Sequence, residues 1–382
     1  MIHKKKYQYP WRYNNSFQLL VDGDDYFSSM LDEIKKAQTQ ILLEAYLFES
    51  GNIADIFIKE LCAAKERNID IFILLDEYGT RGLSDSDKGK LTKAGIELLL
   101  YNPASFFHFG RSLKRDHRKL LTIDGRTAFI GGAGITDEFT PNIKDDYWHD
   151  VMIKVDGDIV FDLIHSFNMV WGKQKETLEI NNEKVKNIYD KVKSKSRVLI
   201  SAGTEENEIS RALIAHIRSS KKRVWLISPY FISSWKIRRA LRHAAKRGVD
   251  VRLVFPGPHS DHKWVTYGIQ RYYQRLLKAN VAVYEFQPRF IHAKIILCDD
   301  WFTLGSSNFD RWDQLLNLDV NIEIYDEQSR QQVIKLFKAD FSKSTLIILN
   351  KWSTRSWLQH IREWVAGVVI RGLGIISRKF KR

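Results

Sequence analysis

The sequence predicts an α/β protein made of two similar halves, and three observations support this prediction. Short runs rich in β-branched and aromatic residues alternate with helical patterns of roughly 10 to 15 residues. The order of these runs occurs twice along the chain, and each copy carries one His-x-Lys-x4-Asp pattern. Alternating strands and helices indicate α/β layers with a largely parallel sheet, although the later strands of each half could form hairpins.

The elements of the two copies follow the same order. In the first copy, the pattern predicts a helix ending near Gln38, then a strand at 40–47, a helix at 53–67 and a strand at 69–76. In the second copy, it predicts a strand at 223–230, a helix at 236–247 and a strand at 249–255. A polar, charged stretch between the copies is predicted to connect them, and an exposed helix of the first half is the alternative for it.

Length and composition exclude several classes of protein. A chain of 382 residues with 44% hydrophobic residues can fill the cores of one large or two medium domains, which excludes wholesale disorder. Cys62 and Cys298 are too few for a disulfide framework, and a reducing, cytosolic setting is expected. The basic start is followed by no apolar stretch, and no window reaches the roughly 18 apolar residues of a spanning helix. An integral membrane protein is therefore not expected.

The charge of the chain favours a polyanionic partner. Lys and Arg number 60 and Asp and Glu number 46, which leaves a net charge of +14. Residues 351–382 hold eight basic residues and one acid, so 8 − 1 = +7, half of the total. Nucleic acid and anionic lipid both fit this excess.

Each half contains one motif whose residues can share a reaction site. The motifs are His117-Arg-Lys119-Leu-Leu-Thr-Ile-Asp124 and His292-Ala-Lys294-Ile-Ile-Leu-Cys-Asp299. Because side chains alternate along a strand, the histidine and lysine of each motif project from one face and the aspartate from the other. The aspartate is therefore expected to anchor backbone or to orient a neighbour.

Two histidines and two lysines suit phosphodiester transfer without a metal. A neutral imidazole can attack phosphorus, an imidazolium can protonate the leaving alkoxide, and the lysines can hold the nonbridging oxygens. Lysine is not a useful ligand for a divalent metal, so no metal and no cofactor are expected. Small residues follow each motif, at 131–134 and 305–308, where Ser307 and Asn308 can donate hydrogen bonds to phosphate.

Each histidine also needs a group that fixes its tautomer, commonly a carboxylate. Asp150 and Asp319 are candidates, 33 and 27 residues beyond the histidines of their own halves. An ordinary solvated aspartate is the alternative at both positions.

With these motifs the chain resembles the phospholipase D superfamily over about residues 16–345. The phrases Ile41-Leu-Leu-Glu-Ala-Tyr, Leu75-Asp-Glu-Tyr-Gly79, Phe129-Ile-Gly-Gly132, Ser228-Pro-Tyr-Phe231, Tyr284-Glu-Phe and Gly305-Ser-Ser-Asn308 are most similar to bacterial cardiolipin synthases of the short type without N-terminal spanning helices. The resemblance implies two α/β/α sandwich domains with pseudo-twofold symmetry and one active site in the cleft between them. We expect a basic segment at 1–15, domains at 16–175 and 197–345, a charged connection at 176–196 and a tail at 346–382.

The resemblance also implies roles for the site residues. His117 would be the nucleophile that forms a phosphohistidine, and His292 the general acid and later the base. Lys119, Lys294 and Asn308 match phosphate-binding positions, and Asp150 and Asp319 match the carboxylates that orient the histidines. Asp124 and Asp299, the last members of the catalytic motifs, would be structural supports. Two positions depart from the family pattern: Gly134 stands where asparagine is common, and Asp319 where glutamate is common.

Three further segments bear on the substrate. Apolar residues in the tail fall on one helical face, as in an interfacial helix on anionic lipid, while a terminal helix packed on the core is the alternative. These residues are Trp357, Leu358, Ile361, Trp364, Val365, Val368 and Val369. The aromatic and basic segment 102–116 could cover a cleft, contact nucleic acid or anchor a buried loop. His259 and His262 are expected in a polar loop rather than at a metal.

These observations lead to a peripheral membrane enzyme that transfers phosphatidyl groups. The resemblance implies a cardiolipin synthase that uses phosphatidylglycerol on the cytoplasmic face of the bacterial inner membrane, with no nucleic acid as partner. A phospholipase D-type hydrolase and a metal-independent nuclease are the alternatives, and a non-enzymatic lipid- or nucleic-acid-binding protein would not need both motifs. The oligomeric state and the choice of donor and acceptor lipid are not predicted.

Overall fold

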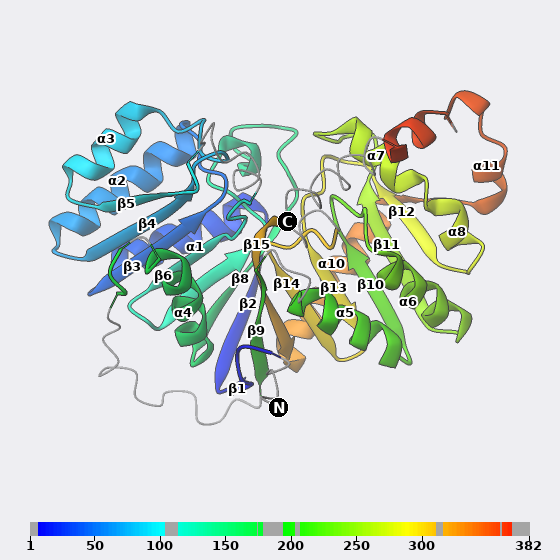
Figure 1. Cartoon of the computed structure of the whole chain (residues 1–382), viewed down its shortest axis with the longest axis horizontal. Coiled ribbons are helices and arrows are strands. Elements are labelled where there is room, and N and C mark those ends of the chain that lie inside the picture. Colours follow the sequence, from blue (N-terminus) through cyan, green and yellow to red (C-terminus); the bar gives the residue numbers. More distant parts are fainter. Residues whose placement is uncertain are drawn as a thin grey trace.

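The computed structural model describes residues 7–103, 114–173, 175–178, 194–202, 207–310, 316–359 and 361–368. It contains two β-sheets, one in each half of the chain, which lie next to each other with helices packed around them (Figure 1). The halves meet along the strands near the middle of the molecule.

The first half forms a seven-stranded sheet with the strand order β2-β8-β7-β6-β3-β4-β5. Its elements are β2 (Asn15–Val21), α1 (Asp22–Lys36), β3 (Gln40–Ala45), α2 (Asn52–Glu66), β4 (Asp70–Asp76), α3 (Asp85–Lys93), β5 (Glu97–Tyr101), β6 (Leu120–Ile123), β7 (Thr127–Gly131), the 3-10 turn η2 (Asp137–Phe139), β8 (Val151–Gly157) and α4 (Ile159–Trp171).

The second half forms a nine-stranded sheet with the order β1-β9-β15-β14-β13-β10-β11-β12-β16. Its elements are β9 (Lys195–Ala202), α5 (Glu208–Ser219), β10 (Arg223–Ile227), α6 (Trp235–Lys246), β11 (Asp250–Pro256), α7 (Lys263–Gln270), α8 (Tyr273–Leu277), β12 (Ala282–Phe286), β13 (Ile295–Cys298), β14 (Trp301–Gly305), β15 (Leu318–Tyr325), α10 (Glu327–Ser342), β16 (Ser344–Leu346) and α11 (Leu349–Ser353), with β1 (Arg12–Tyr13) at one edge. Without its two edge strands, this sheet repeats the order of the first. The repeat confirms the predicted pair of similar α/β halves.

The prediction of a largely parallel sheet is wrong, whereas the predicted hairpins are present. Among the strands that the structure describes, only β3-β4-β5 and β10-β11-β12 pair in parallel, and the other strand pairs are antiparallel. The reason is the length of the connections, since residues 124–126 join β6 to β7 and residues 299–300 join β13 to β14. Parallel neighbours need a crossover of a dozen or more residues.

The aspartates of the two motifs fasten the start of a central strand in each half. Asp124 accepts hydrogen bonds from the backbone N–H groups of Gln38, Thr39 and Gln40, just where β3 begins. Asp299 accepts them from Lys221, Lys222 and Arg223 at the start of β10. Both carboxylates lie beyond the end of the strand that follows the histidine, so the predicted structural role agrees with their contacts and they do not touch the histidines.

The buried apolar side chains form three clusters. One cluster lies under α1 and α2, and another under α5, α6 and α8. The third and largest joins the halves, because it combines α4 and the first sheet with α10 and the second sheet. The halves therefore share one core rather than meeting through a thin polar interface.

Several predicted segments lie partly outside the described residues. The predicted connection at 176–196 falls mostly there, and its last two residues, Lys195 and Ser196, belong to β9. The other proposed domain limits stay predictions. In the part of the chain that the structure describes, no helix combines the length and apolar character needed to cross a bilayer.

A buried histidine forms ionic contacts to both halves. His149 Nδ1 lies 2.7 Å from Asp22 of α1, and its Nε2 lies 3.2 Å from Asp340 of α10. Burial alone would lower the pKa of His149, but the two carboxylates raise it to about 9. Arg289 completes the cluster by an ion pair with Asp22.

We expect His149→Gln to destabilise the protein most at neutral and acidic pH. A histidine whose pKa is raised on folding contributes stability that is fully present below its ordinary pKa of 6.5 and is lost as the pH rises through about 9. The loss should be on the order of 3 kcal/mol at pH 6 and should shrink at pH 10. Urea unfolding at both pH values measures it, with His243→Gln on exposed α6 as the control. An equal loss at both pH values would contradict the charged state of His149.

Candidate active site

The two His-x-Lys segments immediately precede corresponding hairpin strands. Residues 117–119 lead into β6, and residues 292–294 lead into β13. His117, Lys119, His292 and Lys294 are all buried. Arg118 points to the opposite side of its segment, where it donates hydrogen bonds to Ser166 of α4 and forms an ion pair with Asp116. The alternation expected from sequence is therefore present in the first motif.

Each histidine segment is bonded through its backbone to the opposite half. His117 N donates to the carbonyl of Leu318 at 3.0 Å, and Leu318 N donates to Arg115 at 2.9 Å. In the same way, His292 N donates to the carbonyl of His149 at 2.7 Å, and His149 N donates to Phe290 at 2.8 Å. These bridges bring both motifs to the boundary between the halves.

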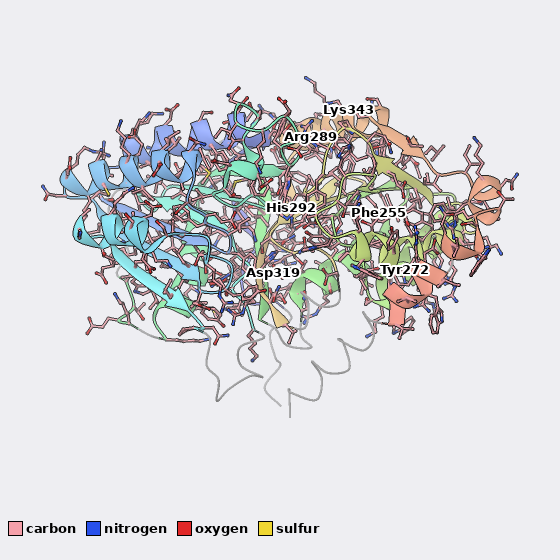
Figure 2. The ribbon with its side chains drawn as sticks, turned by 90° about the horizontal axis from the view of Figure 1, so that it is seen from above. Phe255, Tyr272, Arg289, His292, Asp319 and Lys343 are labelled. Carbon is pink, nitrogen blue, oxygen red and sulfur yellow. The ribbon has the colours of Figure 1, made fainter. Side chains whose placement is uncertain are left out.

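The carboxylates therefore pair with the histidines across the halves. His117 Nδ1 lies 3.0 Å from Asp319 Oδ1, and His292 Nδ1 lies 2.6 Å from Asp150 Oδ2. The positions along the chain associated each carboxylate with the histidine of its own half, and the contacts show that this association is wrong, while the orienting role of both carboxylates stays a prediction. Figure 2 shows His292 and Asp319 close to the middle of the molecule, where the two halves meet.

The two pairs differ in their electrostatics. Burial raises the pKa of Asp319 to about 6, although a hydrogen bond from Ser306 at 2.7 Å and the charge of Lys119 lower it. Burial, with help from Lys294, lowers the pKa of His292 to about 4. Burial would raise the pKa of Asp150, but Lys294 and His292 bring it below its usual value. The second pair is thus a neutral imidazole beside an ionised carboxylate at neutral pH.

The positive charges of Lys119 and Lys294 influence ionisable groups of both motifs. Lys294 Nζ lies 3.0 Å from each ring nitrogen of His292, and Lys119 Nζ donates to the carbonyl of His117 at 2.7 Å. Lys119 also contributes to the lowered pKa of His292, and Lys294 acts on that of Asp319. The electric fields of the two motifs therefore overlap, as a shared site for an anion requires.

Aromatic rings surround the histidines and limit the access of water. Tyr46 contacts the ring of His117 edge-on, with ring centroids 4.8 Å apart. The ring of His292 has four aromatic neighbours, which are Phe139, Trp148, Phe290 and Tyr230. Apolar surroundings strengthen the interaction of charged groups with a phosphodiester.

The small residues after the motifs differ between the halves. Ser306 binds Asp319, but its counterpart Gly132 leaves a position where an added Cβ would lie 2.6 Å from both carboxylate oxygens of Asp150. At Gly134, an added Cβ would lie 2.6 Å from Leu47, so no side chain fits without movement. The second half alone can therefore offer a serine and an asparagine side chain in this turn.

The predicted phosphate-binding residues of the second half are buried. Asn308 receives a hydrogen bond from Ser228 on its carbonyl, and the Ser307 backbone N–H donates to Asn321. The Ser307 hydroxyl is buried and has no hydrogen-bond partner among the described residues. It can therefore donate a hydrogen bond to an oxygen of a ligand. The phosphate-binding role of Ser307 and Asn308 stays a prediction.

The sequence patterns did not indicate that His149 and Ser306 support the site. His149 directly precedes Asp150 and bonds the backbone of His292, and Ser306 bonds Asp319. The sequence feature that could have indicated them is their position, because His149 is next to the candidate Asp150 and Ser306 is next to the candidate Ser307. Of the segment 102–116, residues 104–113 lie outside the described residues.

The loop with His259 and His262 is held by a hydrogen bond from Tyr230 to Asp261. Over the described ranges, no three side chains of His, Cys, Asp or Glu gather as a metal site. The expectation of a metal-free reaction stays a prediction.

Comparisons with known proteins agree with this architecture. A family model described as "Cardiolipin synthase, PLD-like domain" matches residues 30–171 and 213–341. A cardiolipin synthase of Clostridium perfringens (strain 13 / Type A) is 30% identical over 365 residues, covering 93% of this chain and 76% of the relative. Cardiolipin synthase B of Escherichia coli (strain K12) is 31% identical over 340 residues, covering 84% and 79%.

A solved structure shows the same fold. The phosphatidylserine synthase of Haemophilus influenzae Rd KW20 superimposes with a TM-score of 0.73 at 13% identity, covering 95% of this chain and 94% of that protein. The family match extends over both halves and includes both motifs. The chain therefore belongs to the cardiolipin synthase family of proteins with phospholipase D-like domains.

Proposed function

We propose that this protein is a cardiolipin synthase that transfers a phosphatidyl group from one phosphatidylglycerol to another. The observation that carries the proposal is the pair of buried His-x-Lys motifs, each with a carboxylate of the opposite half on its histidine. Two such pairs supply a nucleophile and a proton carrier around one phosphodiester. The family membership supports the lipid as substrate.

The reaction has two displacements at phosphorus. Asp319 accepts the Nδ1–H of His117, so Nε2 carries the lone pair that attacks phosphorus. The bond from phosphorus to the glycerol oxygen breaks, and His292 gives that oxygen its proton. In the second step, His292 removes a proton from a hydroxyl of the incoming phosphatidylglycerol, whose oxygen bonds to phosphorus while the phosphohistidine bond breaks.

The empty site and the loaded site differ in the charge of His292. Its pKa of about 4 makes the imidazole neutral when no substrate is bound. A bound phosphodiester anion opposes the field of Lys294 and Lys119, which favours protonation of His292. Substrate binding thus charges the general acid that the first displacement uses.

We expect His117→Ala to abolish transfer. Purified protein incubated with phosphatidylglycerol vesicles should form cardiolipin and free glycerol, measured by mass spectrometry, and the variant should lose roughly 1,000-fold or more in rate. His243→Ala, on exposed α6, should keep normal activity. Phosphatidic acid as the product would indicate a hydrolase, and a trapped phosphohistidine at His292 would reverse the roles of the histidines.

We expect kcat at saturating phosphatidylglycerol, where the bound substrate keeps His292 protonated, to fall as the pH decreases through about 6. Asp319 takes up a proton there and can no longer accept the Nδ1–H of His117. The hydrogen bond from Ser306 lowers the pKa of Asp319, so Ser306→Ala should move the acidic limb of the pH–rate profile to higher pH. The control variant Ser219→Ala, at an exposed position, should leave the profile unchanged. Rates measured from pH 5 to 9 test this, and an acidic limb that Ser306→Ala does not move would refute the role of Asp319.

We further propose that the tail attaches the enzyme to anionic lipid on the cytoplasmic face of the bacterial cell membrane. Residues 357–359 and 361–368 are helical, and the predicted apolar face points to solvent rather than to the core. Its exposed members are Trp357, Leu358, Ile361, Trp364 and Val368, whereas Val365 is half-buried. Apolar residues that face outward beside basic residues suit a lipid interface.

We expect the double variant Trp357→Ser and Trp364→Ser to bind vesicles of phosphatidylglycerol at least 10-fold more weakly. Both rings are exposed, at 68% and 62%, so their loss removes membrane contact and leaves the core intact. Vesicle flotation measures the change, with exposed Lys236→Ser as the control. Unchanged flotation would contradict attachment by the tail, and tight retention of the wild type on DNA would favour the nuclease.

A further inference from the structure

A pocket of about 180 Å³ lies between the tail and the second half, away from the histidines. Gln270 of α7, Gln274 of α8 and Arg271 between these helices line it on one side, and Trp352, Arg355 and Trp364 line it from the tail. In Figure 1 the tail, drawn in red and orange, lies beside α7 and α8 at the outer end of the second half. The volume equals about six water molecules at their share of the liquid, which is enough for a phosphate group.

Two of the side chains that line the pocket, Arg355 and Trp352, carry buried N–H donors without acceptors among the described residues. The Arg355 side chain is only 9% exposed, and its Nη2 pairs with Glu363 at 3.1 Å. Its Nε and Nη1 have no hydrogen-bond partner among the described residues, and neither has the indole Nε1 of Trp352. The guanidinium carbon of Arg355 lies 3.5 Å from the centroid of the Trp352 ring. The two side chains therefore hold each other in place.

These three unpaired groups are all N–H donors, so the partner that they lack is an acceptor. Arg271 adds a second positive charge, and its guanidinium packs on Gly367, where an added Cβ would lie 2.0 Å from Nη1. Glu363, the acid of the lining, is engaged with Arg355. The guanidinium donors of Arg355 that Glu363 does not engage are suited to the oxygens of a phosphate.

The position of the pocket indicates which phosphate-containing molecule could reach it. Trp364 lines the pocket and is 62% exposed on the outward apolar face of the tail. When that face lies in a bilayer, the pocket beside it is at the depth of the lipid headgroups. We propose that this pocket binds the phosphate of an anionic phospholipid headgroup, as a second lipid site separate from the reaction centre. This inference rests on the proposed attachment of the tail to the membrane.

Two conservative variants test the donors without removing the pocket. Arg355→Lys keeps the charge and the pairing with Glu363 but removes the Nε and Nη1 donors, and Trp352→Phe keeps a ring but removes the indole N–H. Arg362→Lys, exposed on the same segment, is the matched control. Thermal unfolding establishes that each variant is folded before binding is measured.

The probes are two sets of vesicles with equal surface charge, made of digalactosyldiacylglycerol with either phosphatidylglycerol or oleate. We expect Arg355→Lys and Trp352→Phe to bind phosphatidylglycerol vesicles about 10-fold more weakly than Arg362→Lys, with no change on oleate vesicles. Equal binding by all three variants would show that only water occupies the pocket. Equal losses on both vesicle types would show a response to charge rather than to phosphate.

Hydrogen exchange of residues 349–368 distinguishes the source of the phosphate. Phosphatidylglycerol vesicles should protect this segment in the wild type, and inorganic phosphate at millimolar concentration should not. Equal protection by inorganic phosphate would overturn the assignment to a lipid headgroup. Cardiolipin formation by the wild type in detergent micelles is measured separately, so failure of the proposed reaction is distinguishable from failure of this site.

Discussion

The structure depends on the exchange of backbone hydrogen bonds between the halves. His117 bonds to Leu318, and His292 bonds to His149, so each histidine lies beside the carboxylate of the other half. Neither half therefore contains both a motif histidine and the carboxylate that pairs with it. The shared core under α4 and α10 fixes the distance across which these bonds form. Because the pairs are buried, a shift of the halves would leave charged groups without partners, which is costly enough to keep the geometry rigid.

Within this symmetric frame the two pairs are not equivalent, because different side chains surround each carboxylate and each histidine. Ser306 in the second half donates to Asp319, whereas Gly132 in the first half leaves Asp150 without a side-chain donor from that position. Lys294 lies directly against His292 and favours its neutral form. The two halves have the same strand order, but a two-step displacement needs one group to attack and another to carry a proton. The unequal surroundings of the two histidines are consistent with such a division of tasks.

Local patterns predicted the parts of this protein that depend on local chemistry. The strand period placed His117 and Lys119 correctly, and the repeat predicted two similar halves. Sequence could not show that Asp150 serves His292, because that contact joins residues 142 positions apart and depends on how the halves pack. The same limit hid His149, whose partners come from α1 of the first half and α10 of the second half. The antiparallel strands were uncertain because apolar runs look alike in both kinds of sheet.

The tail reverses the usual arrangement of an amphipathic helix. A helix packed on a domain turns its apolar face inward, yet here the tryptophans face outward and the ion pair of Arg355 with Glu363 faces the second half. Burial lowers the pKa of Arg355, which shows that its charge is desolvated even though Glu363 opposes the effect. A segment that buries a charge and exposes neighbouring indole rings has the character of an interaction surface. A lipid surface would cover the apolar face and present phosphate to the donors beneath it.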